Sequence, residues 1–418
     1  MRTVTPASDY RAYTAAWDRV QRAGYRQFNL DTWAGGHRYL SMTALVLSAS
    51  ELAQLKRVTS QFSSLVTLAV ARILADADWW SALAWPWPAI ELARQEPPHP
   101  GGHVSLYGRF DCLLDAAGVW QVIEYNADTP SGGREVSGLA PALARLHPGL
   151  RRVDGQLAPR LIETLTARIR AHHRPVRSVG VVSNHSWLED MAQATWLGAL
   201  LRRAGQPAVV GDITDLALQR DGLTLRGREI DALYRFYPVE RLYRHAIFAS
   251  LCELAIDGRL LLLNGLRGFV AQSKACLAWL WTNRATLDTV ARRALERHLP
   301  PTLIARDPAA EGVLADSIVK HVNGREGDLV VFGDELDSAG WEARLLEPGY
   351  VVQHVVQSPE LEDVEVDDWH EQVRCVGRRV ACVGAFAVGG RFGGCYTRLD
   401  GRITSPRATY VVTLLEPA

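Results

Sequence analysis

Short apolar runs and amphipathic segments alternate along most of the chain. Apolar residues recur at helical spacing over 51–74 and 157–171, which predicts two amphipathic helices. Residues 178–183 and 207–211 are short apolar runs typical of buried strands, and a helical pattern over 187–204 lies between them. A strand, a helix and a strand in this order predict a βαβ-like unit.

The two ends of the chain have different patterns. Residues 1–95 look mainly helical, and Ser48 or Ser50 could cap the helix that begins at residue 51. Residues 347–418 are rich in strand patterns and in glycine. Elements of both kinds alternate between these ends, so we expect a mixed α+β or α/β fold.

Residues 104–126 predict a β-hairpin, because two strand-like runs flank a turn signal over 115–118. Side chains two residues apart share one face of a strand. If residue 111 pairs with residue 124, one face of the hairpin is polar and the other is almost wholly apolar. The polar face holds Arg109, Asp111, Glu124 and Asn126. The apolar face holds Phe110, Cys112, Leu114, Val119, Ile123 and Tyr125, with Gln121 as its one polar member.

The polar face of this hairpin has the donors of a magnesium site. Two carboxylates and an amide oxygen are the ligands that Mg²⁺ prefers, and Arg109 would offer two parallel donors to a phosphoryl oxygen. A solvated hairpin with cross-strand ion pairs explains the same pattern equally well. The loop 126–133 favours the ligand-binding alternative, because its turn residues leave backbone N–H groups that can bind an anion.

Composition and charge exclude some classes of protein. Lys and Arg together number 46, as do Asp and Glu, so the chain lacks the basic excess of a nucleic-acid binder. Its first residues contain no apolar run of a secretory signal, and its apolar stretches fall short of the roughly 20 residues that span a membrane. The six cysteines form no C-x-x-C pair, which favours free, buried thiols and a cytoplasmic location. Four tryptophans over 79–87 could line a ligand pocket, but packing explains them better.

Several segments resemble one known family. The segment RFDCLLDAAGVWQVIEYNADTPSG, residues 109–132, resembles the signature of the glutathionylspermidine synthase family, a branch of the ATP-grasp ligases. The order of the further matching segments is also that of the family, and an ordered set is more specific than any one motif. These segments are IDALYRFYPVERL (230–242), SKACLAWLW (273–281), VKHVNGREG (319–327), YVVQHVV (350–356) and GAFAVGGRFGGCYTR (384–398).

The resemblance implies a role for each matching residue. Asp111, Glu124 and Asn126 would bind Mg²⁺, and Arg109 and Arg398 would contact the transferring phosphate. Lys274 and Lys320 would hold the ATP phosphates; they are two of only three lysines in the chain, which indicates a need for a compact positive charge there. Adenine would lie near Gln353. A mobile loop that closes over the site would include Gly324, Arg325 and Gly327.

The resemblance also implies an architecture. It predicts an ATP-grasp fold built from both ends of the chain, with a pre-ATP-grasp-like α/β domain inserted. The expected parts are an N-terminal helical region (1–103), a part with the metal-binding hairpin (104–175), the inserted domain (176–270) and a part with the lysines and the last strands (271–418).

The activity that the resemblance implies is the joining of a carboxylate to an amine, driven by ATP with Mg²⁺ and passing through an acyl phosphate. The acid would be a peptide or an amino acid and the second substrate an amine or a polyamine, with neither nucleic acid nor membrane as a partner. Substrate-facing segments depart from the family pattern, as at His321, where the family has proline, so glutathione and spermidine are not assumed. A phosphotransferase and a non-catalytic nucleotide-binding protein remain the alternatives.

Overall fold

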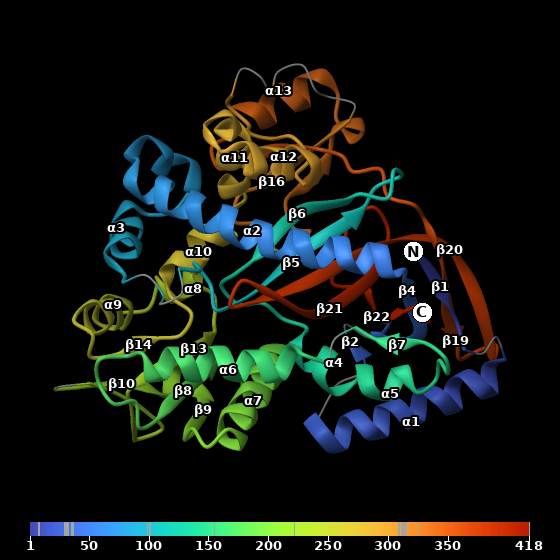
Figure 1. The fold of residues 1–418 in the computed structure, drawn as a ribbon, viewed down its shortest axis with the longest axis horizontal. Helices are drawn as coiled ribbons and strands as arrows, with labels where there is room; N and C mark the ends of the chain where they lie inside the picture. Colours follow the sequence, from blue (N-terminus) through green and yellow to red (C-terminus); the bar gives the residue numbers. More distant parts are fainter. Residues whose placement is uncertain are drawn as a thin grey trace.

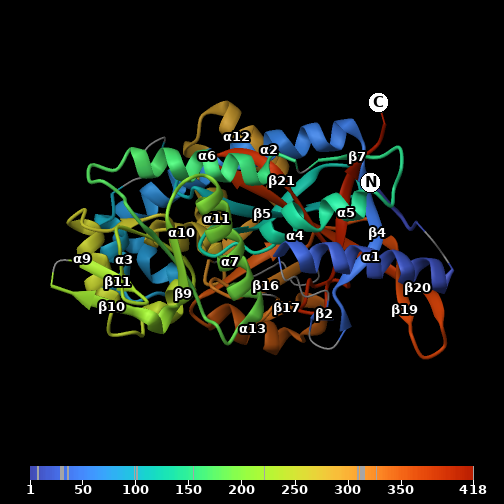
Figure 2. The same ribbon diagram turned by 90° about the horizontal axis from the view of Figure 1, so that it is seen from below.

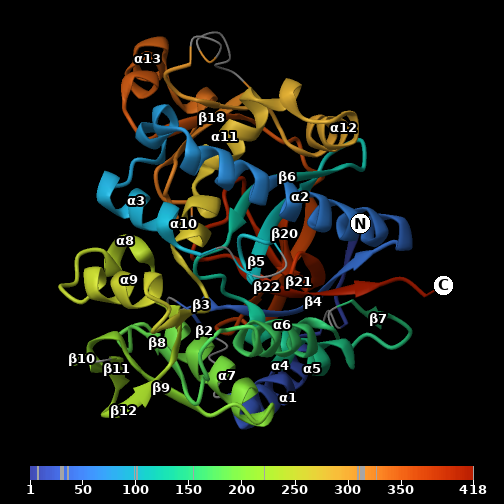
Figure 3. The same cartoon turned by 60° about the vertical axis from the view of Figure 1, so that its left-hand side comes forward.

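The computed structural model describes residues 1–6, 9–28, 33–34, 37–97, 99, 102–153, 155–220, 222–307, 310, 316–325 and 327–417. A large central sheet has a small α/β unit on one side and a second, four-stranded sheet on the other (Figure 1 and Figure 3). The two termini lie near each other at one end of the central sheet (Figure 1).

The central sheet combines strands from both ends of the chain. Within the described residues it has nine strands, seven of them in the order β1-β4-β22-β21-β20-β5-β6, while β19 pairs with β20 and β7 with β22. Strand β4 runs parallel to β22, so the first strands and the last one lie side by side. The bounds are β1 (Arg2–Val4), β4 (Leu40–Leu47), β5 (Tyr107–Leu114), β6 (Trp120–Asn126), β7 (Arg151–Arg152), β19 (Leu361–Asp367), β20 (Gln372–Val388), β21 (Arg391–Asp400) and β22 (Thr409–Leu415).

One face of this sheet is covered by α2 (Ala49–Ala75), the long helix that crosses it in Figure 1. Ser48 caps α2 as expected: its hydroxyl accepts from the Glu51 N–H at 3.2 Å, and the Glu51 carboxylate accepts from the Ser48 N–H at 2.7 Å. We expected no helix of membrane-spanning type, and α2 has the necessary length and apolar composition. Its most apolar window is 56% buried inside the fold, however, as in a core helix.

Other helices cover the opposite face of the sheet, and Figure 2 shows the β19–β20 hairpin projecting beyond them. These helices pack with the sheet in a second apolar core. They are α1 (Tyr10–Phe28), α4 (Gly133–Gly138), α5 (Ala140–Ala144) and α6 (Leu157–Arg170). Three predicted positions of α6 are buried as its helical spacing requires: Leu161, Leu165 and Ile169.

The α/β unit lies against this second core. Its four parallel strands have the order β14-β13-β8-β9, and α7 (Leu188–Arg203) packs on β8 and β9. The predicted strand, helix and strand over 178–211 are thereby confirmed, and α7 ends before Gly205, which has a φ of 79°. The bounds are β8 (Val179–Ser183), β9 (Ala208–Asp212), β13 (Ala232–Phe236), β14 (Leu261–Leu262), α8 (Val239–Leu242) and α9 (Phe248–Ile256), with a small sheet of β10 (Leu216–Gln219), β11 (Gly222–Leu225) and β12 (Arg228–Ile230).

The second four-stranded sheet is antiparallel, in the order β15-β18-β16-β17, and α11 packs on it. Its strands and the helices near it are β15 (Thr302–Ile304), β16 (Ser317–His321), β17 (Val330–Phe332), β18 (Tyr350–His354), α10 (Leu266–Gln272), α11 (Lys274–Thr282), α12 (Thr289–His298) and α13 (Ser338–Leu346). The remaining described elements are α3 (Trp87–Gln95), the ribbon of β2 (Trp33–Ala34) and β3 (His37–Arg38), and the short 3-10 helices η1 (Ala77–Leu83), η2 (Ile213–Asp215), η3 (Arg284–Thr286) and η5 (Gly333–Glu335).

The hairpin of β5 and β6 confirms one part of its prediction and corrects another. Asp111 lies opposite Glu124, as expected. A bulge follows, so that Cys112 pairs with Val122 and the strand changes face. Val122 is therefore buried in the core, and Ile123 lines the cavity on the polar side. The assignment of Ile123 to the apolar face was wrong, because a pattern of alternating residues cannot reveal an extra residue in one strand.

The first hundred residues contain more than helices. The expected helical region 1–103 includes α1, α2 and α3, and it also supplies β1 and β4 to the central sheet. The boundaries expected at residues 103, 175 and 270 stay a prediction. Five of the six cysteines are buried as expected, and the exception is Cys375, which is exposed.

Candidate active site

A cavity of about 1050 Å³ opens where the central sheet, the α/β unit and the second sheet meet. The predicted site residues Arg109, Asp111, Glu124, Asn126, Lys274, Lys320, Gly324, Arg325, Gly327, Gln353 and Arg398 all line it. These residues come from segments far apart in the sequence. The fold brings these residues to one cavity, as the ordered motifs predicted.

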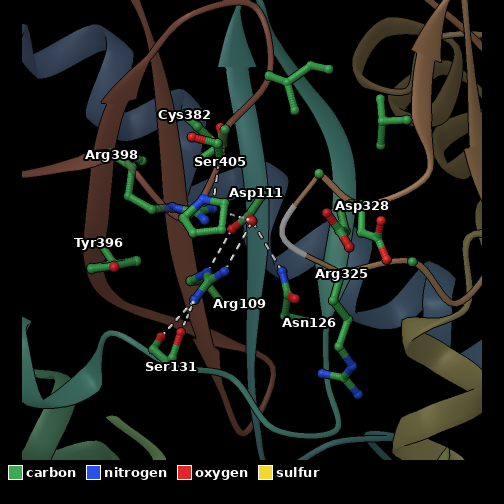
Figure 4. A pocket seen from close by; sticks show the side chains of 18 of the residues that line it. Arg109, Asp111, Asn126, Ser131, Arg325, Asp328, Cys382, Tyr396, Arg398 and Ser405 are labelled. Carbon is green, nitrogen blue, oxygen red and sulfur yellow. Dashed lines mark hydrogen bonds and ion pairs between the residues drawn. The ribbon is translucent and has the colours of Figure 1, made fainter. Parts of the chain in front are cut away.

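Side chains from neighbouring strands form a row along one wall of the cavity (Figure 4). Asp111 lies opposite Glu124 on β6 and opposite Gly384 on β20, and Gly384 lies opposite Tyr396 on β21. Gly384 is needed there, because a Cβ atom would lie only 2.6 Å from Cδ of Arg109. The missing side chain gives the Arg109 guanidinium room to lie flat beside Asp111.

The Asp111 carboxylate is the centre of the row. Arg109 donates to both of its oxygens, from Nε at 2.7 Å and from Nη2 at 3.1 Å, and Arg398 donates from Nη2 at 2.8 Å. The Asn126 amide donates to the same carboxylate at 3.2 Å. Burial raises the pKa of Asp111, but the two guanidinium groups outweigh it and hold that pKa below its ordinary value.

Arg109 is also buried, and Arg398 is largely so, with a side chain that is 14% exposed. Arg109 donates from Nη1 to the carbonyl of Ser131 at 2.8 Å, so the anion-binding loop predicted after the hairpin is tied to the row. Burial works against the charge of Arg398, but the attraction of Asp111 raises its pKa overall. Both guanidinium groups therefore stay charged and fixed in position.

The two lysines reach the cavity from the second sheet and from α11. Lys274 donates from Nζ to Glu124 Oε1 at 3.0 Å and to the carbonyl of Gly324 at 2.8 Å. Lys320 donates to the amide oxygen of Gln353 at 2.7 Å and is only 8% exposed. Burial lowers the pKa of Lys320 to about 8, with Glu124 opposing that shift and Lys274 adding to it.

Arg325 lies apart from the Asp111 cluster (Figure 4). Its guanidinium forms two bonds with Glu240 at the start of the α/β unit's helix α8, at 2.6 and 3.2 Å, and a third with the Thr129 hydroxyl at 3.2 Å. The loop predicted to move is thus joined to another part of the fold through Arg325, which lines the cavity. Of its four motif residues, Glu326 lies outside the described residues.

The donor set of the row fits Mg²⁺. Two carboxylates and an amide oxygen on paired strands are hard oxygen ligands, and Mg²⁺ takes one or two such carboxylates with phosphate oxygens and water completing the shell. No cluster of three or more His, Cys, Asp or Glu side chains suited to a metal occurs among the described residues. The hairpin therefore suits a metal that arrives with a phosphate, which needs fewer protein ligands.

Some residues at the cavity were not singled out by the sequence. Tyr396 and Tyr39 line it, and their hydroxyl groups are hydrogen-bonded to each other. Glu240, which holds Arg325, lies within a matching segment but carried no assigned role. No pattern in the sequence pointed to Tyr39, because only the pairing of β4 with β22 brings it to the cavity.

The tryptophans over 79–87 do not line the cavity. Trp85, for example, packs on Phe269 at 4.7 Å between ring centroids.

Comparisons with known proteins identify the family and the fold of the chain. The model of the family described as glutathionylspermidine synthase preATP-grasp matches residues 11–416. A search of curated proteins finds no significant match. A solved glutathione synthetase-like effector from Globodera pallida, in its apo form, is 11% identical with a TM-score of 0.63, and the alignment covers 98% of each chain. A putative γ-glutamylcysteine synthetase from Methylobacillus flagellatus is 12% identical with a TM-score of 0.47, over 84% of this chain and 88% of that one. The first of these structures shares its fold with this chain over nearly its whole length.

Proposed function

The chain belongs to the glutathionylspermidine synthase preATP-grasp family, and from that premise we propose that it is an ATP- and Mg²⁺-dependent ligase that joins a carboxylate to an amine as an amide. The acid is a peptide or an amino acid, and the amine is a small amine or a polyamine. One observation carries the proposal. Five cationic side chains, two carboxylates and two amides of the predicted site, from distant segments, line one cavity.

The charges of the cavity suit the first half of such a reaction. A carboxylate that attacks the γ-phosphate of ATP brings negative charge to a triphosphate that is already negative. Arg109 and Arg398 are rigidly held beside Asp111, and fixed cations of this kind stabilise developing charge without having to reorganise. Lys274 and Lys320 extend the positive wall toward Gln353, where we place the nucleotide.

Asp111, Glu124 and Asn126 would hold Mg²⁺, which would neutralise part of the phosphate charge when bound. The segment 324–327 has a separate task. An acyl phosphate must be kept from water until the amine attacks it and phosphate leaves. A loop that lines the cavity and is held by the ion pair of Arg325 with Glu240 suits that task.

The test is to measure ADP and phosphate release from MgATP with a panel of carboxylic acids and amines, and to identify products by mass spectrometry. An amide product formed only when both substrates are present is the expected result. A stable phosphate ester without an amide would instead favour a phosphotransferase. Stabilisation by MgATP without turnover of any pair would favour a non-catalytic nucleotide-binding protein.

Two lysine variants make this test sharper. We expect Lys274→Met to abolish ADP release, because it removes a charge from the cavity wall. Lys56→Met is the matched control: it removes the one lysine that lies outside the cavity, on the exposed side of α2. Equal activity of the two variants would contradict the proposed nucleotide site.

A further inference from the structure

We infer that Tyr396 is a positioning residue for Arg109 and Arg398, and that Tyr39 from the N-terminal part of the chain holds Tyr396 in place. The Cζ atoms of Arg109 and Arg398 lie 5.2 and 5.5 Å from the centroid of the Tyr396 ring. Both distances are within the range of cation–π attraction, which is stronger away from water. The ring is buried, and so it faces two charged groups in a poorly solvated place.

The arginines need such support because they are like charges that share one carboxylate. Arg109 and Arg398 both bond to Asp111, and the charge of Arg398 works against that of Arg109. Asp111 is also a proposed metal ligand, so its carboxylate would interact less strongly with the two arginines when the metal is bound. The face of an aromatic ring also attracts cations, and this attraction does not depend on whether a metal or a nucleotide is bound. Tyr396 is therefore a contact that both guanidinium groups would keep when Asp111 binds a metal.

The Tyr396 ring is itself fixed from several sides. It stacks on Tyr410, with centroids 5.4 Å apart and an angle of 19° between the planes. Gly132 approaches it so closely that a Cβ atom there would lie 2.4 Å from the ring. Its hydroxyl is bonded to the hydroxyl of Tyr39, and burial raises the pKa of Tyr396 to about 12, which keeps that hydroxyl protonated.

Tyr39 comes from the first hundred residues, whose role was not evident in the sequence. It directly precedes β4, and its carbonyl accepts a hydrogen bond from the Tyr410 N–H at 2.7 Å. Its ring also stacks on Tyr410, with centroids 6.1 Å apart. The pairing of β4 with β22 thus brings an N-terminal tyrosine into the wall of the cavity. The N-terminal part of the chain completes the support of the two arginines.

The kinetic test rests on the proposed function. Tyr396→Leu removes the ring, and we expect kcat to fall roughly 5- to 30-fold, the loss that corresponds to one or two cation–π contacts. The KM for ATP should change less, because Lys274 and Lys320 remain. Tyr396→Phe keeps the ring and should restore most of kcat, whereas Tyr39→Phe should show a smaller loss than Tyr396→Leu. Phe62→Leu, a similar truncation against Phe110 in the core under α2, is the control and should leave kcat unchanged.

A crystal structure of Tyr396→Leu gives a readout that needs no activity. We expect the guanidinium groups of Arg109 and Arg398 to shift from their places in the wild type. Unshifted guanidinium groups would overturn the inference, and so would a kcat equal to that of wild type or an equal loss of kcat in Phe62→Leu. If the wild type turns over no pair of substrates, the proposed function fails, and the crystal structures alone still decide whether Tyr396 positions the arginines.

Discussion

The effect of burial on the charge of Lys320 can be tested without any substrate, through the pH dependence of stability. Burial lowers its pKa from 10.5 to about 8, so the folded chain gives up this proton more readily than the unfolded chain does. Below pH 8 both states hold the proton, and the folded state bears the full cost of a buried ammonium group. Between pH 8 and 10.5 the unfolded state binds more protons, and stability therefore rises with pH over this interval.

The magnitude follows from the two pKa values. Each pKa unit corresponds to 1.36 kcal/mol, and integration from pH 7 to pH 9.5 gives a gain of about 2 kcal/mol from this one group. Lys320→Met abolishes the gain. Other effects of the substitution, such as the lost hydrogen bond to Gln353, do not change with the protonation of Lys320 and shift the whole curve equally.

The assay is urea denaturation of the wild type and of Lys320→Met at half-unit steps from pH 7 to 9.5. The difference in unfolding free energy should change by about 2 kcal/mol in favour of the wild type as the pH rises. Lys56→Met shows what the loss of a lysine outside the cavity does. Parallel curves for the wild type and Lys320→Met would refute the reasoning, because they would mean that burial does not perturb Lys320.

Three further variants test other parts of the structure. Asp111→Asn leaves two buried arginines without their counter-charge, and we expect a loss of about 3–5 kcal/mol in urea denaturation together with loss of any Mg²⁺-dependent ADP release. Glu240→Gln removes the ionic partner of Arg325; backbone amides of 321–325 should exchange faster in hydrogen-exchange mass spectrometry, while global stability falls by about 1 kcal/mol or less. Ser48→Ala should cost about 1 kcal/mol in thermal denaturation, because the cap of α2 is lost.

The hairpin shows what local patterns predict well. The alternation over 109–114 and the turn after it were enough to place Asp111 opposite Glu124 and to bring four polar side chains onto one face. The same pattern failed at the neighbouring residue Ile123, because the bulge after the pair of Asp111 and Glu124 changes the face of β6. A bulge has no fixed signature in a sequence, and so Ile123 was assigned to the core.

Local sequence patterns did not predict the contacts between segments that are far apart in the chain. The resemblance to the family identified Lys274 and Lys320, but only the fold shows that one pairs with Glu124 and the other with Gln353. The place of Tyr39 depends on a parallel pairing between the first and last parts of the chain. Helical and strand periodicity describes one element at a time and carries no information about such pairings.

The charged groups of the site already have partners within the fold. Arg109 and Arg398 share Asp111, and Lys274 pairs with Glu124, so three cations share two carboxylates. No ion pair of the described residues includes Lys320, whose direct partner is the neutral Gln353, and burial lowers its pKa.

These four cations outnumber the two carboxylates, and the charges of the site therefore favour an anionic ligand. The two carboxylates that pair with the cations are also the proposed metal ligands. Binding of a magnesium-bound triphosphate would then exchange partners, with phosphate oxygens taking over the cations as the carboxylates turn to the metal. Such an exchange leaves none of the three paired cations without a partner, and it lets the fold hold these groups ready before the substrate arrives.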